Sequence, residues 1–252
     1  MQRIAIIPAR YASTRLPGKP LLDICGKPML QHVYEQATKS SMDRVIIATD
    51  DQRIFDQMRE IGCEICMTST EHRSGTDRLA EVATKYQFDD DDIVVNVQGD
   101  EPLIPPEVIN QVAELLLLNQ DAAVSTLSTA IEDEQTLQDP NVVKVVCNQQ
   151  GEALYFSRAP IPWNRDSVNT EALFHGTYQR HIGIYGYRVS FLKQYSQWSA
   201  CDLENIESLE QLRVLWHGDK IQVAEAISVP PEGVDTDADL EKIRSIINSK
   251  DK

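Results

Sequence analysis

The chain has 252 residues, of which 42% are hydrophobic and 25% charged, as in an ordinary globular protein. Its 24 Lys and Arg against 39 Asp and Glu give a formal net charge of −15. This charge argues against nucleic acid as a partner, because such binding depends on cations that neutralise phosphates. No apolar run approaches the ~18 residues that cross a bilayer, and the N-terminus lacks a signal-peptide pattern. We therefore expect a cytoplasmic protein without membrane insertion.

The first hundred residues alternate apolar runs with segments of helical periodicity. The apolar runs predict strands at 3–9, 43–50, 63–69 and 91–100. The periodic segments predict helices at 28–40, 51–62 and 75–88. This alternation favours an α/β protein with a mostly parallel central sheet flanked by helices on both faces.

The rhythm changes from Asp121 onward. Strand-like runs linked by turns occupy 122–131, 142–148, 153–161 and 181–188, and helices return at 206–219 and 237–250. No Gly/Ser-rich linker or composition shift marks a boundary. We therefore expect one domain over residues 1–252 that carries a strand-rich inserted lobe at approximately 121–200.

Five cysteines lie far apart in the chain, at Cys25, Cys63, Cys66, Cys147 and Cys201. Their odd number and wide spacing make a disulfide framework a poor explanation. The "CEIC" at 63–66 has the spacing of half a zinc site, but no second C-x-x-C exists. The pattern favours small apolar residues in a β-strand.

A cationic loop follows the first predicted strand in "IAIIPARYASTRLPGKPLL" (4–22). It carries Arg10, Arg15 and Lys19 ahead of the first acid, Asp23, and so reverses the acidic average of the chain. Ligands of open parallel sheets bind beyond the carboxyl ends of the strands, where this loop lies. Its single glycine, Gly18, excludes the G-x-G-x-x-G dinucleotide motif, whereas Arg and Lys suit several phosphates. A solvated surface loop is the alternative, and charge alone does not decide between the two.

A second polar segment follows the apolar strand in "DDIVVNVQGDEPLIP" (91–105). Asp100 comes directly after this strand, at the sheet edge where the cationic loop is expected. A carboxylate beside bound phosphates is repelled unless a divalent cation lies between them, and Mg²⁺ prefers such oxygen ligands. Asp100 is therefore a candidate Mg²⁺ ligand. The alternative is a turn residue that accepts local backbone amides.

Seven segments carry a family resemblance: "IIPARYASTRLPGKPLLDICGKPML", "EHRSGTDRLAEV", "VNVQGDEPLIP", "ALYFSRAPIPW", "RHIGIYGYR", "LENIESLEQLRVL" and "PEGVDTDADLEKI". In this order they closely resemble the family of 3-deoxy-manno-octulosonate cytidylyltransferases, or CMP-Kdo synthetases. The resemblance covers essentially the whole chain, whereas the first segment alone points only to the wider sugar nucleotidyltransferase superfamily.

The resemblance implies a Rossmann-like nucleotidyltransferase fold, Mg²⁺ as cofactor and a homodimer, with the strand-rich lobe at approximately 121–200 serving sugar binding and dimerisation. It implies the transfer of a cytidylyl group from CTP to 3-deoxy-D-manno-octulosonate (Kdo), which gives CMP-Kdo and pyrophosphate for lipopolysaccharide biosynthesis. CTP and Kdo would then be the substrates.

The resemblance also assigns roles to single residues. The triphosphate-binding loop corresponds to Pro8, Ala9, Arg10, Arg15 and Lys19, and the cytosine-recognition segment to Ser74 and Gly75. The metal-binding carboxylates correspond to Asp100 and Asp235. The sugar-acid pocket maps onto Gln98, Arg158, His181, Tyr185 and Glu210. Catalysis would rest on Arg15 and Lys19, which compensate charge on the leaving pyrophosphate, and on Asp100, which serves the metal.

Structural alternatives exist for several of these residues. Asp235 lies beside Thr236, which forms a capping-box pattern with Asp239, so helix capping alone would account for carboxylates there. The strand at 181–188 fits simple β-packing. Glu210 fits a solvated helix face.

Two other functions compete with this assignment. The first is a synthetase that activates a different acidic sugar, such as sialic acid or an 8-amino Kdo analogue. The second is a nucleotide-binding regulator without catalysis. The presence of Lys19, Asp100 and Asp235 together argues against the regulator, because a mere binder does not require the whole metal-and-phosphate set.

Overall fold

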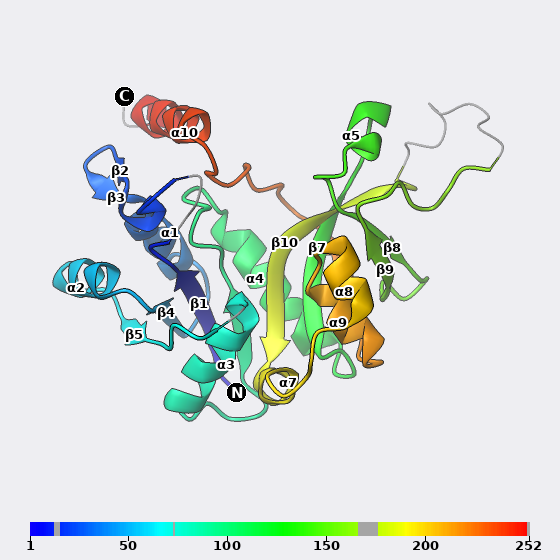
Figure 1. The fold of residues 1–252 in the computed structure, drawn as a ribbon, viewed down its shortest axis with the longest axis horizontal. Helices are drawn as coiled ribbons and strands as arrows, with labels where there is room; N and C mark the ends of the chain where they lie inside the picture. The colour runs from blue at the N-terminus through cyan, green and yellow to red at the C-terminus, as the bar shows by residue number, and fades with distance from the viewer. Residues whose placement is uncertain (13–15, 73, 166–175, 251–252) are drawn as a thin grey trace.

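The computed structural model describes residues 1–12, 16–72, 74–165 and 176–250, and a nine-stranded sheet runs through the described part (Figure 1). Its main strands are β1 (Arg3–Ala9), β4 (Arg44–Thr49), β5 (Ile65–Met67), β6 (Ile93–Asn96), β7 (Val124–Ala130), β10 (Gln179–Arg188) and β11 (Ile221–Glu225). They lie in the order β11-β7-β10-β6-β1-β4-β5. Of the neighbouring pairs, only those that β10 makes with β6 and β7 are antiparallel. The predicted α/β class with a mostly parallel central sheet is confirmed.

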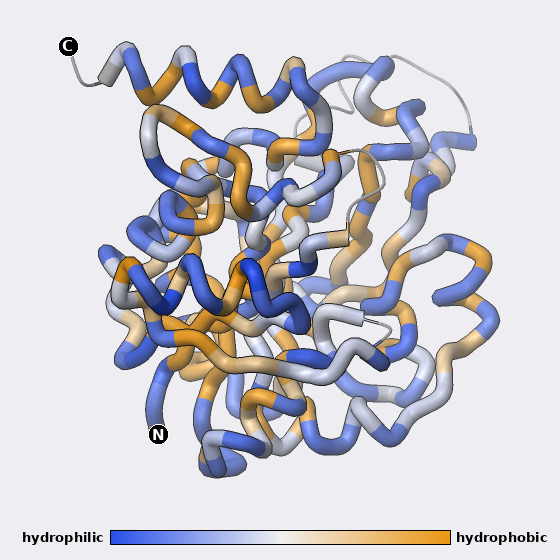
Figure 2. Tube along the Cα trace, turned by 60° about the vertical axis from the view of Figure 1, so that its left-hand side comes forward, coloured by the Kyte–Doolittle hydropathy of each residue, from blue (hydrophilic) through white to orange (hydrophobic). Residues whose placement is uncertain are grey.

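Helices cover both faces of this sheet. One face carries α1 (Met29–Thr38), α2 (Gln52–Glu60) and α4 (Pro106–Leu118). The other face carries α3 (Gly75–Lys85), α7 (Val189–Tyr195) and α9 (Gln211–Trp216). Successive strand residues point to opposite faces, so in β1 Ile6 packs in one cluster and Ile7 in the other. Figure 2 shows hydrophobic residues concentrated in these central strands.

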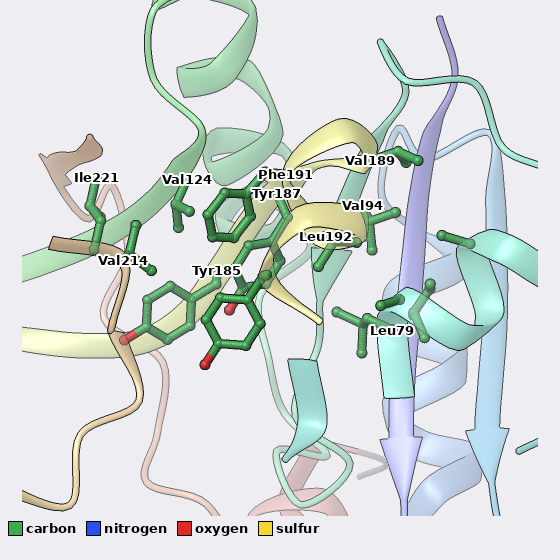
Figure 3. Close-up of a cluster of buried hydrophobic side chains, with 14 of the residues drawn as sticks. Leu79, Val94, Val124, Tyr185, Tyr187, Val189, Phe191, Leu192, Val214 and Ile221 are labelled. Atoms are coloured by element: carbon green, nitrogen blue, oxygen red, sulfur yellow. The ribbon is translucent and has the colours of Figure 1, made fainter. Parts of the chain in front are cut away.

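An aromatic row anchors the antiparallel strand β10 against α7 (Figure 3). The ring centroids of Tyr185 and Tyr187 are 5.9 Å apart, and those of Tyr187 and Phe191 are 6.0 Å apart with nearly parallel planes. Leu79 of α3 and Val94 of β6 belong to the same buried cluster. Part of the strand at 181–188 therefore does serve core packing.

The strand-rich stretch near 121–200 contributes to the main sheet and also extends it. Strands β7 and β10 lie within the sheet, whereas β8 (Lys144–Cys147) pairs antiparallel with both β10 and β9 (Ala153–Ser157). The short helix α5 (Glu134–Gln138) precedes β8. Figure 1 shows this pair at the side of the molecule away from β5. Its separate status as a sugar-binding and dimerisation lobe stays a prediction.

The helix predicted at 206–219 is wrong in one respect, because the chain breaks there into α8 (Asp202–Glu207) and α9. Ser208 adopts a left-handed conformation, with φ 53° and ψ 50°, which ends α8. The Glu207 carboxylate accepts hydrogen bonds from the Ser157 hydroxyl at 2.6 Å and the Arg158 amide at 2.9 Å. These contacts from β9 are distant in sequence, so periodicity does not reveal the break. The sequence patterns also left α4, α7 and β11 unpredicted.

The C-terminal helix α10 (Asp237–Lys250) packs away from the main core. It packs against β2 (Asp23–Ile24), which pairs with β3 (Lys27–Pro28) in a hairpin that follows the short helix η1 (Lys19–Leu21). Its apolar stripe joins a separate small cluster of Leu16, Ile24, Met29, Val234, Leu240 and Ile243. Arg244 also donates to the Asp23 carbonyl at 2.5 Å. The last helix is thereby held beside the loop that follows β1.

The two cysteines of "CEIC" are both buried, with Cys66 inside β5. Burial, with a smaller contribution from Glu35, raises the pKa of the Cys63 thiol to about 11. The structure therefore shows both as small core residues, as the pattern favoured.

Among the described residues, no helix has the length and apolar character needed to cross a membrane.

Candidate active site

The site begins where the strand order reverses. From β1 the chain proceeds to β4 and β5 on one side of that strand and later returns to β6 on the other. In open α/β sheets, ligands bind in the crevice beyond the carboxyl ends of the strands at such a point. The two segments that leave these ends are the cationic loop after Ala9 and the segment 97–101 after β6.

Gly99 allows these two segments to approach closely. A Cβ atom at Gly99 would lie 2.8 Å from the Pro8 carbonyl oxygen, closer than side-chain carbons come to backbone oxygens. The Val97 amide also donates to the Ile6 carbonyl at 3.0 Å, so the ladder between the two strands continues up to the crevice. The loop after β1 and the segment after β6 are thus held side by side.

A pocket of about 350 Å³ opens between them. Its lining contains seven of the sequence-predicted site residues: Pro8, Ala9, Arg10, Lys19, Gln98, Asp100 and Asp235. Asp235 reaches the pocket from the segment that precedes α10, more than 130 residues after Asp100 in the sequence. Arg15, the remaining predicted cation of the loop, lies outside the described residues.

Lys19 connects the two predicted metal-binding carboxylates. Its Nζ lies 2.7 Å from Oδ2 of Asp100 and 3.0 Å from Oδ1 of Asp235. Burial disfavours the charged ammonium, but the two carboxylates outweigh that effect and raise the pKa of Lys19 above its usual value. Two carboxylates therefore converge on one position that holds a positive charge.

The convergence of Asp100 and Asp235 fits a hard divalent cation. Mg²⁺ is usually held by one or two protein carboxylates, with substrate phosphates and water completing its oxygen ligands. The described residues contain no cluster of three or more His, Cys, Asp or Glu side chains suited to a metal, so two carboxylates are the protein's contribution here.

Burial and the neighbouring Asp100 raise the pKa of the adjacent Glu101 carboxyl to about 8.

Helix capping does not account for Asp235. The cap of α10 is made by Thr236 and Asp239: the Asp239 carboxylate accepts from the Thr236 amide at 2.8 Å, and the Asp239 amide donates to the Thr236 hydroxyl at 3.3 Å. The Asp235 side chain faces Lys19 instead. The backbone amide of Val234 donates to the Asp100 carbonyl at 2.9 Å, which fixes the approach of this segment.

The predicted cytosine segment lies beside the same pocket. Ser74 is the N-cap of α3 and forms a reciprocal capping box with Asp77. Arg10 donates from Nη2 to the His72 carbonyl at 2.6 Å, which links the cationic loop to the segment before Ser74. First-turn amides of a helix have no partner within the helix, so the N-terminus of α3 suits an electron-rich acceptor.

Three of the predicted sugar-pocket residues lie near one another. Gln98 donates to the Gly183 carbonyl of β10 at 3.1 Å. On the same strand, the rings of His181 and Tyr185 have centroids 5.2 Å apart. Burial lowers the pKa of His181 to about 3, so its imidazole is neutral at physiological pH. Its Nε2 is 3.0 Å from the Thr126 hydroxyl.

The other two sugar-pocket candidates are engaged inside the protein. Glu210 accepts from the Thr76 hydroxyl at 2.7 Å, in a cavity of about 10 Å³ that also has Tyr185 in its wall. That volume holds no more than about one water molecule. Arg158 donates from Nη1 to the Pro140 carbonyl at 3.0 Å and from Nε to the Glu207 carbonyl at 2.7 Å. The structure therefore does not bring these two into one open pocket with Gln98, and their roles toward sugar stay predictions.

Several contacts of the site were missed by the sequence patterns. Three hydrogen bonds use backbone or short polar groups that no motif marks. They are made by the His72 carbonyl, the Thr76 hydroxyl and the Val234 amide. Tyr11 in the cationic loop packs under the Arg53 guanidinium at 3.3 Å from the ring centroid. For this cation–π contact the sequence did offer a signal, namely an aromatic residue within a cationic loop.

The fold is that of α/β proteins whose ligands bind at the carboxyl edge of the sheet, where this pocket lies. A family model described as cytidylyltransferase matches residues 4–221, so the chain belongs to the cytidylyltransferase family and is a nucleotidyltransferase. It is 57% identical to the 3-deoxy-manno-octulosonate cytidylyltransferase of Aeromonas hydrophila, with 98% of this chain and 99% of that protein covered. It is 58% identical to the protein of the same name from Pseudomonas fluorescens, with 97% of each covered.

A solved structure of CMP:2-keto-3-deoxy-manno-octonic acid synthetase complexed with CTP matches with a TM-score of 0.90 and 43% identity, over 99% of this chain and 100% of that one. The resemblance found in the sequence segments and the Rossmann-like nucleotidyltransferase fold expected from it are thus confirmed.

Proposed function

We propose that this protein transfers the cytidylyl group of CTP to Kdo, giving CMP-Kdo and pyrophosphate. The observation that carries the proposal is the pocket after β1 and β6, in which Lys19 lies between Asp100 and Asp235. Relatives that are more than half identical in sequence carry the name of this activity, and a similar solved structure holds CTP.

The cations of the loop after β1 bind the triphosphate in this proposal. Arg10 offers a planar guanidinium and Lys19 a compact ammonium on a flexible chain. Arg15 belongs to the same predicted set. Lys19 and Arg15 compensate the charge that develops on the leaving pyrophosphate. Cytosine belongs at Ser74 and Gly75, beside the N-terminus of α3.

Asp100 and Asp235 are the residues that would hold Mg²⁺. When bound, Mg²⁺ lowers the pKa of the attacking sugar hydroxyl and neutralises phosphate charge. The chain's own part is to keep both carboxylates in place. The Val234 amide supports this by bonding the Asp100 carbonyl, and the cap made by Thr236 and Asp239 leaves Asp235 directed at the pocket.

The reaction is an in-line displacement at the α-phosphorus. A bond forms from the sugar hydroxyl oxygen to that phosphorus, the bond to the bridging oxygen breaks, and the electron pair leaves with pyrophosphate. The hydroxyl proton passes to solvent. The protein contributes position and compensating charge, which supply most of the catalysis in phosphoryl transfer.

The sugar acid would lie toward β10, next to the nucleotide pocket. Gln98 supports this placement because it lines that pocket and also bonds the Gly183 carbonyl. The neutral His181 and Tyr185 lie on the same strand, two residues to either side of Gly183. Thr76 donates to Glu210, whose small cavity also has Tyr185 in its wall, and Arg158 donates to the Ser208 carbonyl.

Two further properties belong to the proposal without a direct structural argument. A homodimer follows from the family resemblance. The cytoplasmic location expected from the sequence stays a prediction.

The test is a pyrophosphate-release assay in which the four nucleoside triphosphates are crossed with Kdo, 8-amino Kdo and sialic acid, with and without Mg²⁺. We expect release with CTP and Kdo that disappears on addition of EDTA. Absence of release with every pair would overturn the proposal, and release with another sugar acid alone would reassign the substrate.

Asp100→Ala is the sharpest variant for this assay. We expect turnover to fall by about 100-fold or more with the fold retained, because a carboxylate that holds the metal is lost. Asp121→Ala, at an exposed position between α4 and β7, is the matched control and should be fully active. Near-normal turnover of Asp100→Ala would show that Asp100 does not hold the metal.

A further inference from the structure

The segment 68–72, which follows β5, is bound to a carboxylate on α3. Glu81 lies seven residues after the N-cap Ser74, so it occupies the same face of the helix. Its side chain is 19% exposed and points back toward the segment. No motif in the sequence marked this residue.

Three groups bind the Glu81 carboxylate. The Ser69 amide donates to Oε2 at 2.8 Å, and the Nε2 of His72 forms a short hydrogen bond with the same oxygen. Lys85 lies 2.7 Å from Oε1 and donates to the Met67 carbonyl at 2.7 Å. Glu81 and Lys85 thus hold the chain at three places: Met67 at the end of β5, Ser69 and His72.

The electrostatics agree with this geometry. Burial alone would raise the pKa of Glu81, but the bonds from Lys85, the Ser69 amide and His72 outweigh it and lower that pKa to about 2. The carboxylate is therefore ionised at any pH at which the protein works. The i,i+4 ion pair with Lys85 contributes little by itself. The bonds to Ser69 and His72 matter more, because they hold residues that lie outside any helix or strand.

The segment in turn contacts the proposed nucleotide site at two places. The carbonyl of His72 accepts from Arg10, a predicted triphosphate ligand, at 2.6 Å. Two residues later, Ser74 opens α3 at the predicted cytosine site. His72 is thus bonded to Arg10 and lies two residues before the N-cap of α3.

We infer that Glu81 is a positioning residue that sets the affinity and base selectivity of the nucleotide site through His72 and Ser69. Glu81 itself lies outside the lining of the nucleotide pocket. The inference rests on the proposed function, because it concerns the site assigned there to CTP.

The experiment uses Glu81→Gln, which keeps the shape of the side chain and removes its charge. We expect the KM for CTP, and its calorimetric Kd, to rise about tenfold, with the KM for Kdo within about twofold of the wild type. The ratio of kcat/KM for CTP over UTP should fall about fivefold or more, because the cytosine segment is no longer fixed. If Glu81 contributed only to stability, its substitution would not raise the KM for CTP more than the KM for Kdo.

Glu35→Gln is the matched control. Glu35 on α1 also binds a lysine, Lys27 at 2.8 Å, and has a lowered pKa, but it lies outside the lining of the nucleotide pocket. Its substitution should leave the KM for CTP and the base selectivity unchanged.

His72→Gln provides a second measurement, since it removes the ring contact and keeps the backbone carbonyl. In combination with Glu81→Gln the losses should not add, because both changes break one unit. If Glu81→Gln does not fold, His72→Gln is judged by the same criteria.

Wild-type KM and base selectivity in a folded Glu81→Gln protein, or equal rises of KM for both substrates, would overturn the inference. If the wild-type protein itself neither binds nor uses CTP, the proposed function fails instead.

Discussion

His181 is a buried residue whose lowered pKa affects how the stability of the protein depends on pH. It lies on β10 between the ring of Phe156, at a centroid distance of 5.1 Å, and that of Tyr185. Its Nε2 faces the Thr126 hydroxyl, which suits a neutral imidazole. Because burial lowers its pKa from 6.5 to about 3, the native protein resists a proton that the unfolded chain accepts readily.

The predicted consequence is that His181 destabilises the protein in acid. Between about pH 6.5 and pH 3 the unfolded chain binds one more proton at His181 than the native protein does, so the contribution of His181 to the free energy of unfolding falls with decreasing pH. Glu101, whose pKa is raised to about 8, contributes with the opposite sign below that pH. The contribution is about 1.4 kcal/mol per pH unit in the middle of that range, and stability is fully present above pH 6.5.

Chemical denaturation from pH 7.5 to 4 measures this slope. Relative to the wild type, His181→Asn should change this slope by about one proton, whereas Gln197→Asn, at an exposed position without a titratable side chain, should leave it unchanged. Equal slopes for wild type and His181→Asn would show that His181 titrates normally.

At the scale of elements, the sequence predicted what local periodicity determines. The strands β1, β4, β5 and β6 and the helices α1, α2 and α3 were found because apolar runs alternate there with amphipathic segments, and this order also placed Arg10, Lys19 and Asp100 at one sheet edge. The short elements η1, β2 and β3 show no such pattern and were not found. The break at Ser208 was not found either, because the bond from Ser157 to Glu207 beside it joins residues 50 positions apart. Contacts between distant elements also hold Glu210, a predicted sugar-pocket residue, as its bond from Thr76 shows.

Asp235, the second predicted metal-binding carboxylate, lies two residues before helix α10, which packs on a small core of its own. Ile243 is 3% exposed and packs with Leu16, Ile24 and Met29, apart from the two clusters that flank the sheet. We predict that Ile243→Ala loosens α10 without unfolding the sheet. Asp235 would then be held less firmly, and the Mg²⁺ concentration for half-maximal activity would rise by about three- to tenfold.

Hydrogen exchange of residues 234–250 and a Mg²⁺ titration of activity measure the two effects together. Ile206→Ala, at a position 80% exposed on α8, is the control and should change neither. Faster exchange throughout the central strands would mean that α10 is part of the main cooperative unit, and would contradict the prediction.

At the scale of the whole molecule, the proposed function requires a protein of net charge −15 to bind a triphosphate of the same sign. Lys19 is already paired with Asp100 and Asp235, so the local positive charge is partly compensated before a nucleotide binds. Beyond about 10 Å, salt at physiological strength screens the remaining acidic surface. The decisive repulsion therefore comes from the two carboxylates inside the pocket.

This balance predicts that CTP and Mg²⁺ stabilise the protein jointly. With both at about 100 times their dissociation constants, the melting temperature should rise by about 5–10 °C, because only the native state binds them. CTP with EDTA should raise it much less, since nothing then separates the triphosphate from the carboxylates. Asp235→Asn should reverse the pattern: CTP alone stabilises this variant at least as well as the wild type, and Mg²⁺ adds little. Equal shifts by CTP with and without Mg²⁺ in the wild type would show that the carboxylates do not face the triphosphate.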